Sequence, residues 1–280
     1  MAASLNAEVL KLRKRPATWI LLLIFAAATL LFGYLFTYLF VVNAPEGQAG
    51  LPQEARDGIL EFLIPESVLG NVLGTFASFG SALALILGAL AMGSEYGWDN
   101  FKTILTQRPG RLGFLAGKLL AVGSLLLAIT LFILAAGAVA SYVIASAENA
   151  AVEWPSAWEI IKGVGAGWLI LATFAATGVF LATLFRGTAL AIGIGLVYLL
   201  VLENLFLGLT SQNETIASIG RRLPAKNSLD LAAAFGQAPP GFGGAPGETV
   251  EPATAAVTLG IYAVAFLALT ALLFKRRDVT

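Results

Sequence analysis

The chain has 280 residues, of which 58% are apolar and only 12% are charged, and its mean hydropathy of +0.83 excludes a soluble globular protein. Basic and acidic residues number 17 each, so the net charge of zero gives no reason to expect a nucleic-acid partner. The chain contains neither Cys nor His, which excludes disulfides, thiolate nucleophiles, His-ligated metals and Ser-His catalysis.

Residues 1–16 are predicted to form a cytosolic amphipathic helix. Leu5, Val9 and Leu12 recur at helical spacing, and Pro16 is expected to end the helix before the first apolar run. Four basic residues are expected to supply positive charge to lipid headgroups: Lys11, Arg13, Lys14 and Arg15.

A helix needs ~20 mostly apolar residues to cross a bilayer. Six segments meet this requirement, so we predict an all-α polytopic membrane protein whose transmembrane helices lie at about 17–42, 70–93, 114–145, 163–185, 188–209 and 253–274. Two rows of small residues within these spans indicate close helix packing: Gly70 with Gly74, and Gly163 with Gly165 and Gly167. The chain between the fifth and sixth spans, 210–252, forms the largest predicted outer loop.

The distribution of charge predicts the orientation. If the N-terminus is cytosolic, 12 of the 17 basic residues fall on the inner side, and 13 of the 17 acids fall outside or in an outward-running helix. Because Lys and Arg are enriched in cytosolic loops, this bias predicts a multi-pass protein with both termini in the cytosol.

The segment 94–112, between the second and third spans, is predicted to contain an amphipathic helix along the cytosolic surface. On a helix one face carries Trp98, Phe101, Ile104 and Leu105, and Pro109 then stops the helix. The aromatic residues suit an apolar groove of a partner, while Lys102, Arg108 or Arg111 suit acids at its rim. The alternative interpretation is an ordinary inner loop whose basic residues follow the positive-inside rule.

This part of the chain also contains an ordered series of motifs: Glu95-Tyr96, Lys102-Thr103-Ile104-Leu105-Thr106, Pro109, Arg111 and Gly117-Lys118. The series resembles the segment between the second and third spans of ABC-2 type permeases, the membrane subunits of one class of ATP-driven exporter. The chain has Asp99-Asn100 where that family has a Gly-Thr pair. The resemblance extends to the overall topology of six spans with a basic amphipathic N-terminal helix.

The resemblance implies that 94–112 is a coupling helix, which sits in a groove of a separate ATP-binding subunit. The residues implied in that contact are Glu95, Tyr96, Trp98, Phe101, Lys102, Leu105, Arg108 and Arg111. It also implies a dimer of permease subunits with two ATPase copies in the cell membrane, working as an exporter. No cofactor is then expected in this chain, because ATP and Mg²⁺ would be bound by the partner.

Glu203 is the one acid well inside an apolar run. An ionised group at that depth costs a few kcal/mol, so it should face protein or a water-filled cavity. One interpretation places Glu203 and Asn204 at a cavity or gate for the substrate. The other places them near the outer interface, in hydrogen bonds with a neighbouring helix.

Three other functions are alternatives to the permease. A self-sufficient secondary transporter or channel should carry charged residues on several spans, whereas only Glu203 is visible. A membrane-embedded enzyme is disfavoured because the chain lacks His, Cys and clustered acids. A non-transporting scaffold that docks another protein through 94–112 fits the sequence as well as a permease does.

Overall fold

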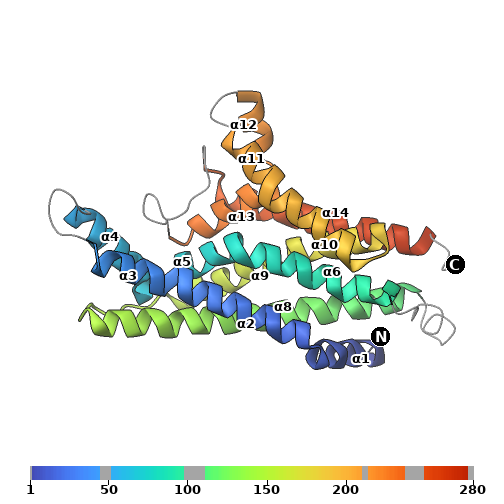
Figure 1. Cartoon of the computed structure of the whole chain (residues 1–280), viewed down its shortest axis with the longest axis horizontal. Helices are drawn as coiled ribbons and strands as arrows, with labels where there is room; N and C mark the ends of the chain where they lie inside the picture. Colours follow the sequence, from blue (N-terminus) through green and yellow to red (C-terminus); the bar gives the residue numbers. More distant parts are fainter. Residues whose placement is uncertain (1, 45–51, 98–110, 210–213, 237–248, 277–280) are drawn as a thin grey trace.

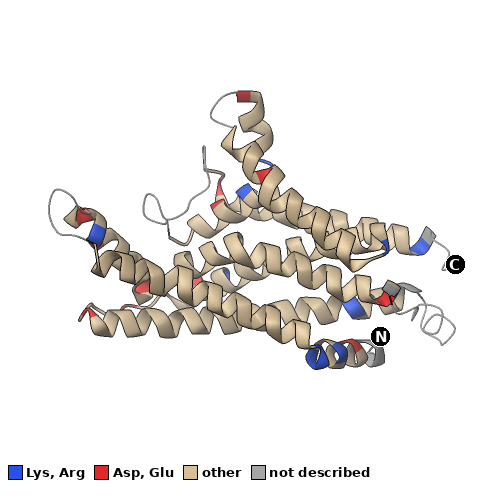
Figure 2. Cartoon of the chain, in the orientation of Figure 1, with Lys and Arg blue, Asp and Glu red and all other residues tan. Residues whose placement is uncertain are grey.

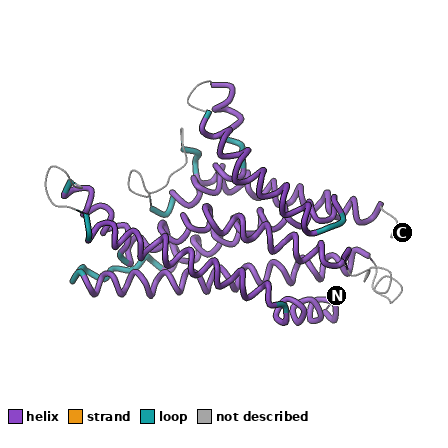
Figure 3. The backbone as a smooth tube through the Cα atoms, in the orientation of Figure 1, coloured by secondary structure: helices purple, strands orange, loops and turns teal. Residues whose placement is uncertain are grey.

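A computed structural model describes residues 2–44, 52–97, 111–209, 214–236 and 249–276. Helices form almost all of this part of the chain, and no strand occurs in it (Figure 3). Within the same residues six helices are long and apolar enough to cross a bilayer: Pro16–Val42, Pro65–Tyr96, Gly113–Ala147, Ala157–Phe185, Thr188–Gly208 and Pro252–Lys275. The prediction of an all-α polytopic membrane protein with six transmembrane helices is therefore confirmed.

Three of the spans are single α-helices: α8 (Arg111–Ala147), α9 (Ala157–Phe185) and α14 (Pro252–Arg276). The other three are built from shorter segments in line. The first span consists of α2 (Pro16–Ala28), η1 (Thr29–Leu35) and α3 (Phe36–Val42). The second consists of η2 (Pro65–Ser67), α5 (Val68–Thr75), η3 (Phe76–Gly80) and α6 (Ser81–Gly97). The fifth consists of α10 (Thr188–Leu196), η4 (Val197–Leu202) and α11 (Glu203–Gly208).

The segmented spans each contain a π-helical turn, namely η1, η3 and η4. Side chains next to two of these turns bond to carbonyls five residues earlier. Thr37 Oγ1 donates to the Phe32 carbonyl at 2.9 Å, and Asn204 Nδ2 donates to the Leu199 carbonyl at 3.1 Å. Such turns are rare and hydropathy does not predict them, so the sequence showed three uninterrupted spans instead.

The centre of the molecule is the contact between α6 and α9. A Cβ atom added to Gly88 would lie 2.1 Å from the Ala175 carbonyl oxygen, and one added to Gly178 would lie 2.0 Å from the Leu85 carbonyl oxygen. The two backbones therefore touch directly, which only a residue without a side chain permits. This pair of glycines brings the second and fourth spans closer than ordinary side chains would allow.

The glycine rows that the sequence indicated pack only in part. Gly70, Gly163 and Gly167 lie close against other segments, whereas nothing lies within 4 Å of a Cβ built at Gly74 or Gly165. The closest helix contact thus uses Gly88 and Gly178, which lie outside those rows.

Four shorter helices complete the described structure: α1 (Ala2–Lys14), α4 (Gln53–Leu63), α12 (Glu214–Gly220) and α13 (Pro224–Ala233). Most of α13 is buried, and it packs against α14 and α5. Within it Lys226 Nζ lies 2.7 Å from Asp230 Oδ1, and Asp230 also accepts a hydrogen bond from the Val250 backbone N–H. A buried charge requires such a partner, so α13 is an integral part of the fold.

Parts of four helices meet at one end of the molecule. α1, the last turns of α6 and α14, and the start of α8 all lie there (Figure 1). Figure 2 shows that α1 carries a concentration of basic residues at this same end. The segment 98–110 lies outside the described residues, and the described helices on either side of it are α6 and α8.

Candidate coupling site

Two oppositely charged residues flank the segment 98–110. Glu95 lies near the end of α6, and Lys118 lies near the start of α8. Lys118 Nζ is 3.0 Å from Glu95 Oε1, and the two side chains are only 2% and 1% exposed. The pair is thus a buried ion pair that joins the two helices at the base of the segment.

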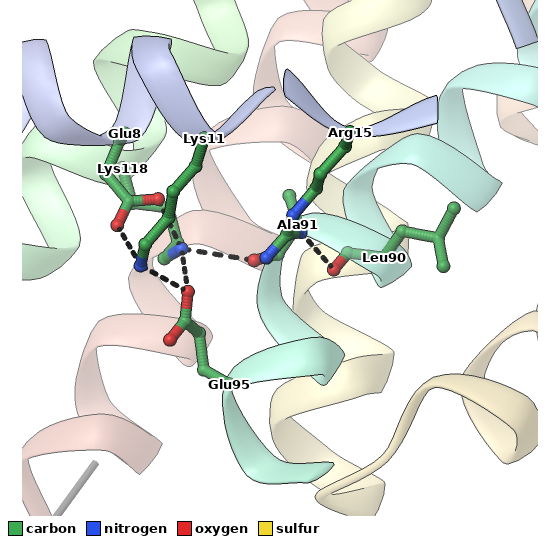
Figure 4. Close-up of polar contacts among 7 residues, drawn as sticks. All are labelled: Glu8, Lys11, Arg15, Leu90, Ala91, Glu95 and Lys118. Atoms are coloured by element: carbon green, nitrogen blue, oxygen red, sulfur yellow. Dashed lines mark hydrogen bonds and ion pairs between the residues drawn. The ribbon is translucent and has the colours of Figure 1, made fainter. Parts of the chain in front are cut away.

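The N-terminal helix α1 completes this site with an acid and a base of its own. Glu8 Oε2 lies 2.6 Å from Lys118 Nζ, while Lys11 Nζ lies 3.0 Å from both Glu8 Oε1 and Glu95 Oε1 (Figure 4). Lys118 also donates to the Ala91 carbonyl at 3.1 Å. We call Glu8, Lys11, Glu95 and Lys118 the ionic cluster. Its two acids balance its two bases, so it carries no net charge.

The members of the ionic cluster differ in exposure. Glu8, Glu95 and Lys118 are buried, whereas the side chain of Lys11 is about one-third exposed. Burial by itself lowers the pKa of Lys11, but hydrogen bonds and charge from Glu8 and Glu95 outweigh it, so the pKa rises above its usual 10.5. Because the folded protein holds this proton more tightly, the contribution of Lys11 to stability persists up to pH 10.5 and is lost only above it.

One oxygen of the ionic cluster lacks a donor. Glu95 Oε2 is buried and accepts no hydrogen bond from any residue that the structure describes. A carboxylate oxygen in that position normally accepts at least one bond. The site can therefore accept a further donor next to the segment 98–110.

A third basic residue, Arg15, connects the same elements. Arg15 stands between α1 and α2, and its Nη1 donates to the Leu90 carbonyl of α6 at 3.3 Å. The structure adds contacts of Lys11 and Arg15 with α6, while the expectation that these two residues supply charge to lipid headgroups stays a prediction. The α6 partner of Lys11 lies 84 residues away in the chain and that of Arg15 lies 75 residues away, so a local pattern could not reveal them. Arg13 and Lys14 do remain exposed.

The structure describes two of the eight predicted contact residues in full. Glu95 belongs to the ionic cluster, and Tyr96 packs against the neighbouring apolar residues of α6 and α8. Arg111 begins α8, and its side chain is outside the description. The remaining five lie outside the described residues: Trp98, Phe101, Lys102, Leu105 and Arg108.

Sequence reasoning did not include Glu8, Lys11 or Lys118 among the site residues. A signal for Lys118 was present, because it is a cation near the start of the long third apolar run, and ionisable residues in spans are often functional. Glu8 was the one acid in an otherwise basic helix. Neither observation indicates that these residues meet, since that depends on how α1 folds back onto α8.

Glu203 and Asn204 lie at a second, separate position. The Glu203 side chain is buried at the start of α11 and accepts a hydrogen bond from the Ala225 backbone N–H in the first turn of α13. A carboxylate is favourable at a helix N-terminus. Asn204 does not join this contact, because its Nδ2 donates to the carbonyls of Leu199 and Leu200 in its own span. A role for these two residues in a gate stays a prediction.

Six apolar helices with a buried ionic cluster at one end define a multi-pass membrane protein. The model of a family described as ABC-2 family transporter protein matches residues 4–202, which include the whole ionic cluster. The chain belongs to this ABC-2 transporter family and is a membrane permease of ABC transport systems. A comparison with curated proteins found no match. Permeases of this family generally associate with an ATP-binding subunit and are not themselves catalytic.

Proposed function

We propose that this chain is the permease subunit of an ATP-driven exporter, and that a separate ATPase drives it through the segment 98–110. The observation that carries the proposal is the ionic cluster. Both helices that flank the segment are joined there to each other and to α1 by ion pairs, of whose members only Lys11 is partly exposed. A partner that displaces the segment would therefore displace α1, α6 and α8 together.

The route from this end of the molecule to the spans follows from the packing. α6 continues into the backbone contact with α9 at Gly88 and Gly178, so a movement of α6 acts on the fourth span directly. Close-packed interiors transmit displacement because they contain little free space. The ATPase would act on the segment, and the paired spans would carry the change toward the outer side.

The orientation and assembly complete the proposal. Both termini would be cytosolic, because α1 with its basic residues and the end of α14 lie at the same end of the molecule.

The first, fifth and sixth spans are the least buried. Within an apolar stretch of 18 residues in each of them, only 22%, 28% and 22% of the residues are buried. These surfaces fit the bilayer and a second permease subunit, so we propose a dimer in the cell membrane.

Affinity purification of the tagged protein from its native membrane in mild detergent tests the proposal. We expect an ATP-binding subunit and ATPase activity to copurify, and both to be lost when Trp98→Ala and Phe101→Ala are combined. Trp158→Ala is the matched control, because Trp158 is 65% exposed at the start of α9, beyond the far end of α8.

Three results would reject the proposal. One is a preparation that is repeatedly free of ATPase, which would favour a self-sufficient transporter or channel. Another is full coupled activity in the doubly substituted protein. The third is an ATPase that binds without any transport in reconstituted vesicles, which would favour a scaffold.

A further inference from the structure

A groove of about 240 Å³ opens between α1, α2 and α8 beside the ionic cluster. Its floor is one face of α8, which carries Ala121, Ser124 and Ala128. Residues three, four and seven positions apart share a helix face, so these small side chains leave a continuous hollow. Leu12 of α1 and Leu22 of α2 form apolar walls on either side.

A hydrogen bond joins α1 to α2 beside the groove. Trp19 Nε1 donates to the Arg13 carbonyl at 2.8 Å and so connects the second helix to the end of the first. The Trp19 side chain is 50% exposed and lines the groove. Tryptophan is enriched where a bilayer meets water, which is also where the first span begins, at Pro16.

The mouth of the groove carries positive charge that no other described residue neutralises. Arg13 lines the groove and is exposed, and the neighbouring Lys14 is exposed as well. Among the described residues neither forms an ion pair, whereas Lys11 is held in the ionic cluster. An apolar hollow with a cationic rim at the membrane boundary is complementary to an amphiphile with an anionic head.

We propose that this groove binds an anionic phospholipid. One acyl chain lies along Ala121, Ser124 and Ala128 of α8, and the phosphate pairs with Arg13 at the rim. The bound lipid holds α1 against α8, next to Lys118. This site is independent of any ATPase, so its test and the test of the exporter proposal succeed or fail separately.

The test uses the full chain in lipid nanodiscs that contain a trace of phosphatidylglycerol with a photoactivatable acyl chain, followed by mass spectrometry of the labelled peptides. We expect labelling on α8 around Ser124, and competition by unlabelled phosphatidylglycerol but not by phosphatidylcholine. Arg13→Gln should reduce labelling roughly fivefold, because one basic residue near an anionic surface contributes that much. Ser124→Trp should abolish it by filling the groove.

Two matched variants serve as controls. Lys275→Gln removes another exposed charge near the same end of the molecule, and Val143→Trp adds an indole at an exposed position near the other end of α8. Neither should change the labelling. The proposal is wrong if phosphatidylcholine competes equally well, if Arg13→Gln labels as strongly as the natural protein, or if the label falls on other helices.

Discussion

At the scale of single residues, Lys118 is the central member of the ionic cluster. It is the buried cation that faces Glu8 and Glu95, at 2.6 and 3.0 Å. Lys118→Met leaves those carboxylates buried with only the partly exposed Lys11 to balance them. Removing one partner of a buried ion pair typically costs about 3–5 kcal/mol. We expect a loss of that order in the free energy of unfolding, measured by denaturant titration in detergent micelles.

Two further variants separate charge from packing at this position. Adding Glu8→Gln and Glu95→Gln to Lys118→Met should restore much of the stability, because no uncompensated buried acid then remains. Lys162→Met changes an exposed lysine and should stay within about 0.5 kcal/mol. Unchanged stability of the single Lys118 variant would show that the ionic cluster does not hold α1 in place.

The buried carboxylate of Glu203 gives a second prediction at this scale. Its Oε1 accepts the hydrogen bond from the Ala225 N–H, so Glu203→Gln keeps an acceptor while Glu203→Leu removes it. An unpaired buried N–H costs about 1–3 kcal/mol, and we expect a loss of that size for the Leu variant alone. Thermal unfolding of both variants measures the difference. Equal stability of the two would mean that Glu203 does not hold the start of α13.

At the scale of helices, the contact between α6 and α9 depends on two glycines. Gly178→Ala would place a Cβ atom 2.0 Å from the Leu85 carbonyl oxygen, so the two helices must separate. We expect a loss of about 1–3 kcal/mol in unfolding free energy, as for other overpacked interiors. Gly165→Ala is the control on the same helix, because its Cβ would meet nothing within 4 Å. A Gly178 variant as stable as this control would contradict the close contact.

The sequence predicted those features of the helices that depend on neighbouring residues, and not those that depend on packing between helices. Six spans could be counted because each apolar run is long enough by itself, and the number is confirmed. The π-helical turns η1, η3 and η4 could not be found, since they are adjustments of hydrogen bonding inside apolar segments. Gly88 and Gly178 were missed for a related reason, because only the packed structure shows which glycines face another backbone.

Even less of the candidate site could be predicted, because its residues are brought together from distant parts of the chain. Glu95 was identified through a local motif, whereas its partner Lys11 lies 84 residues away and was expected to face lipid. The assignment of basic residues to headgroups assumed that α1 presents its charged face outward. In the structure part of that face lies against α6 and α8. Glu8 is buried there, and because a buried charge needs a partner it forms ion pairs with Lys11 and Lys118.

At the scale of the whole molecule, the helices that the proposed ATPase would contact or displace lie together at one end. α1, the end of α6 and the start of α8 are joined there by the ionic cluster, while the helices run away from it (Figure 1). The arrangement supports a permease in which a force on the segment 98–110 moves several helices as one body. The lipid groove beside α1 would strengthen the same attachment from the membrane side.

Site-specific crosslinking to the ATP-binding subunit is the most direct test of the proposed contact between that subunit and the segment 98–110. The chain contains no cysteine, so Phe101→Cys introduces a single thiol without any background substitution. With a short bifunctional reagent in native membranes, the account predicts a crosslinked product that contains the permease and an ABC ATPase, and no such product from Trp158→Cys. A permease that crosslinks to the ATPase from position 158 but not from position 101 would contradict it.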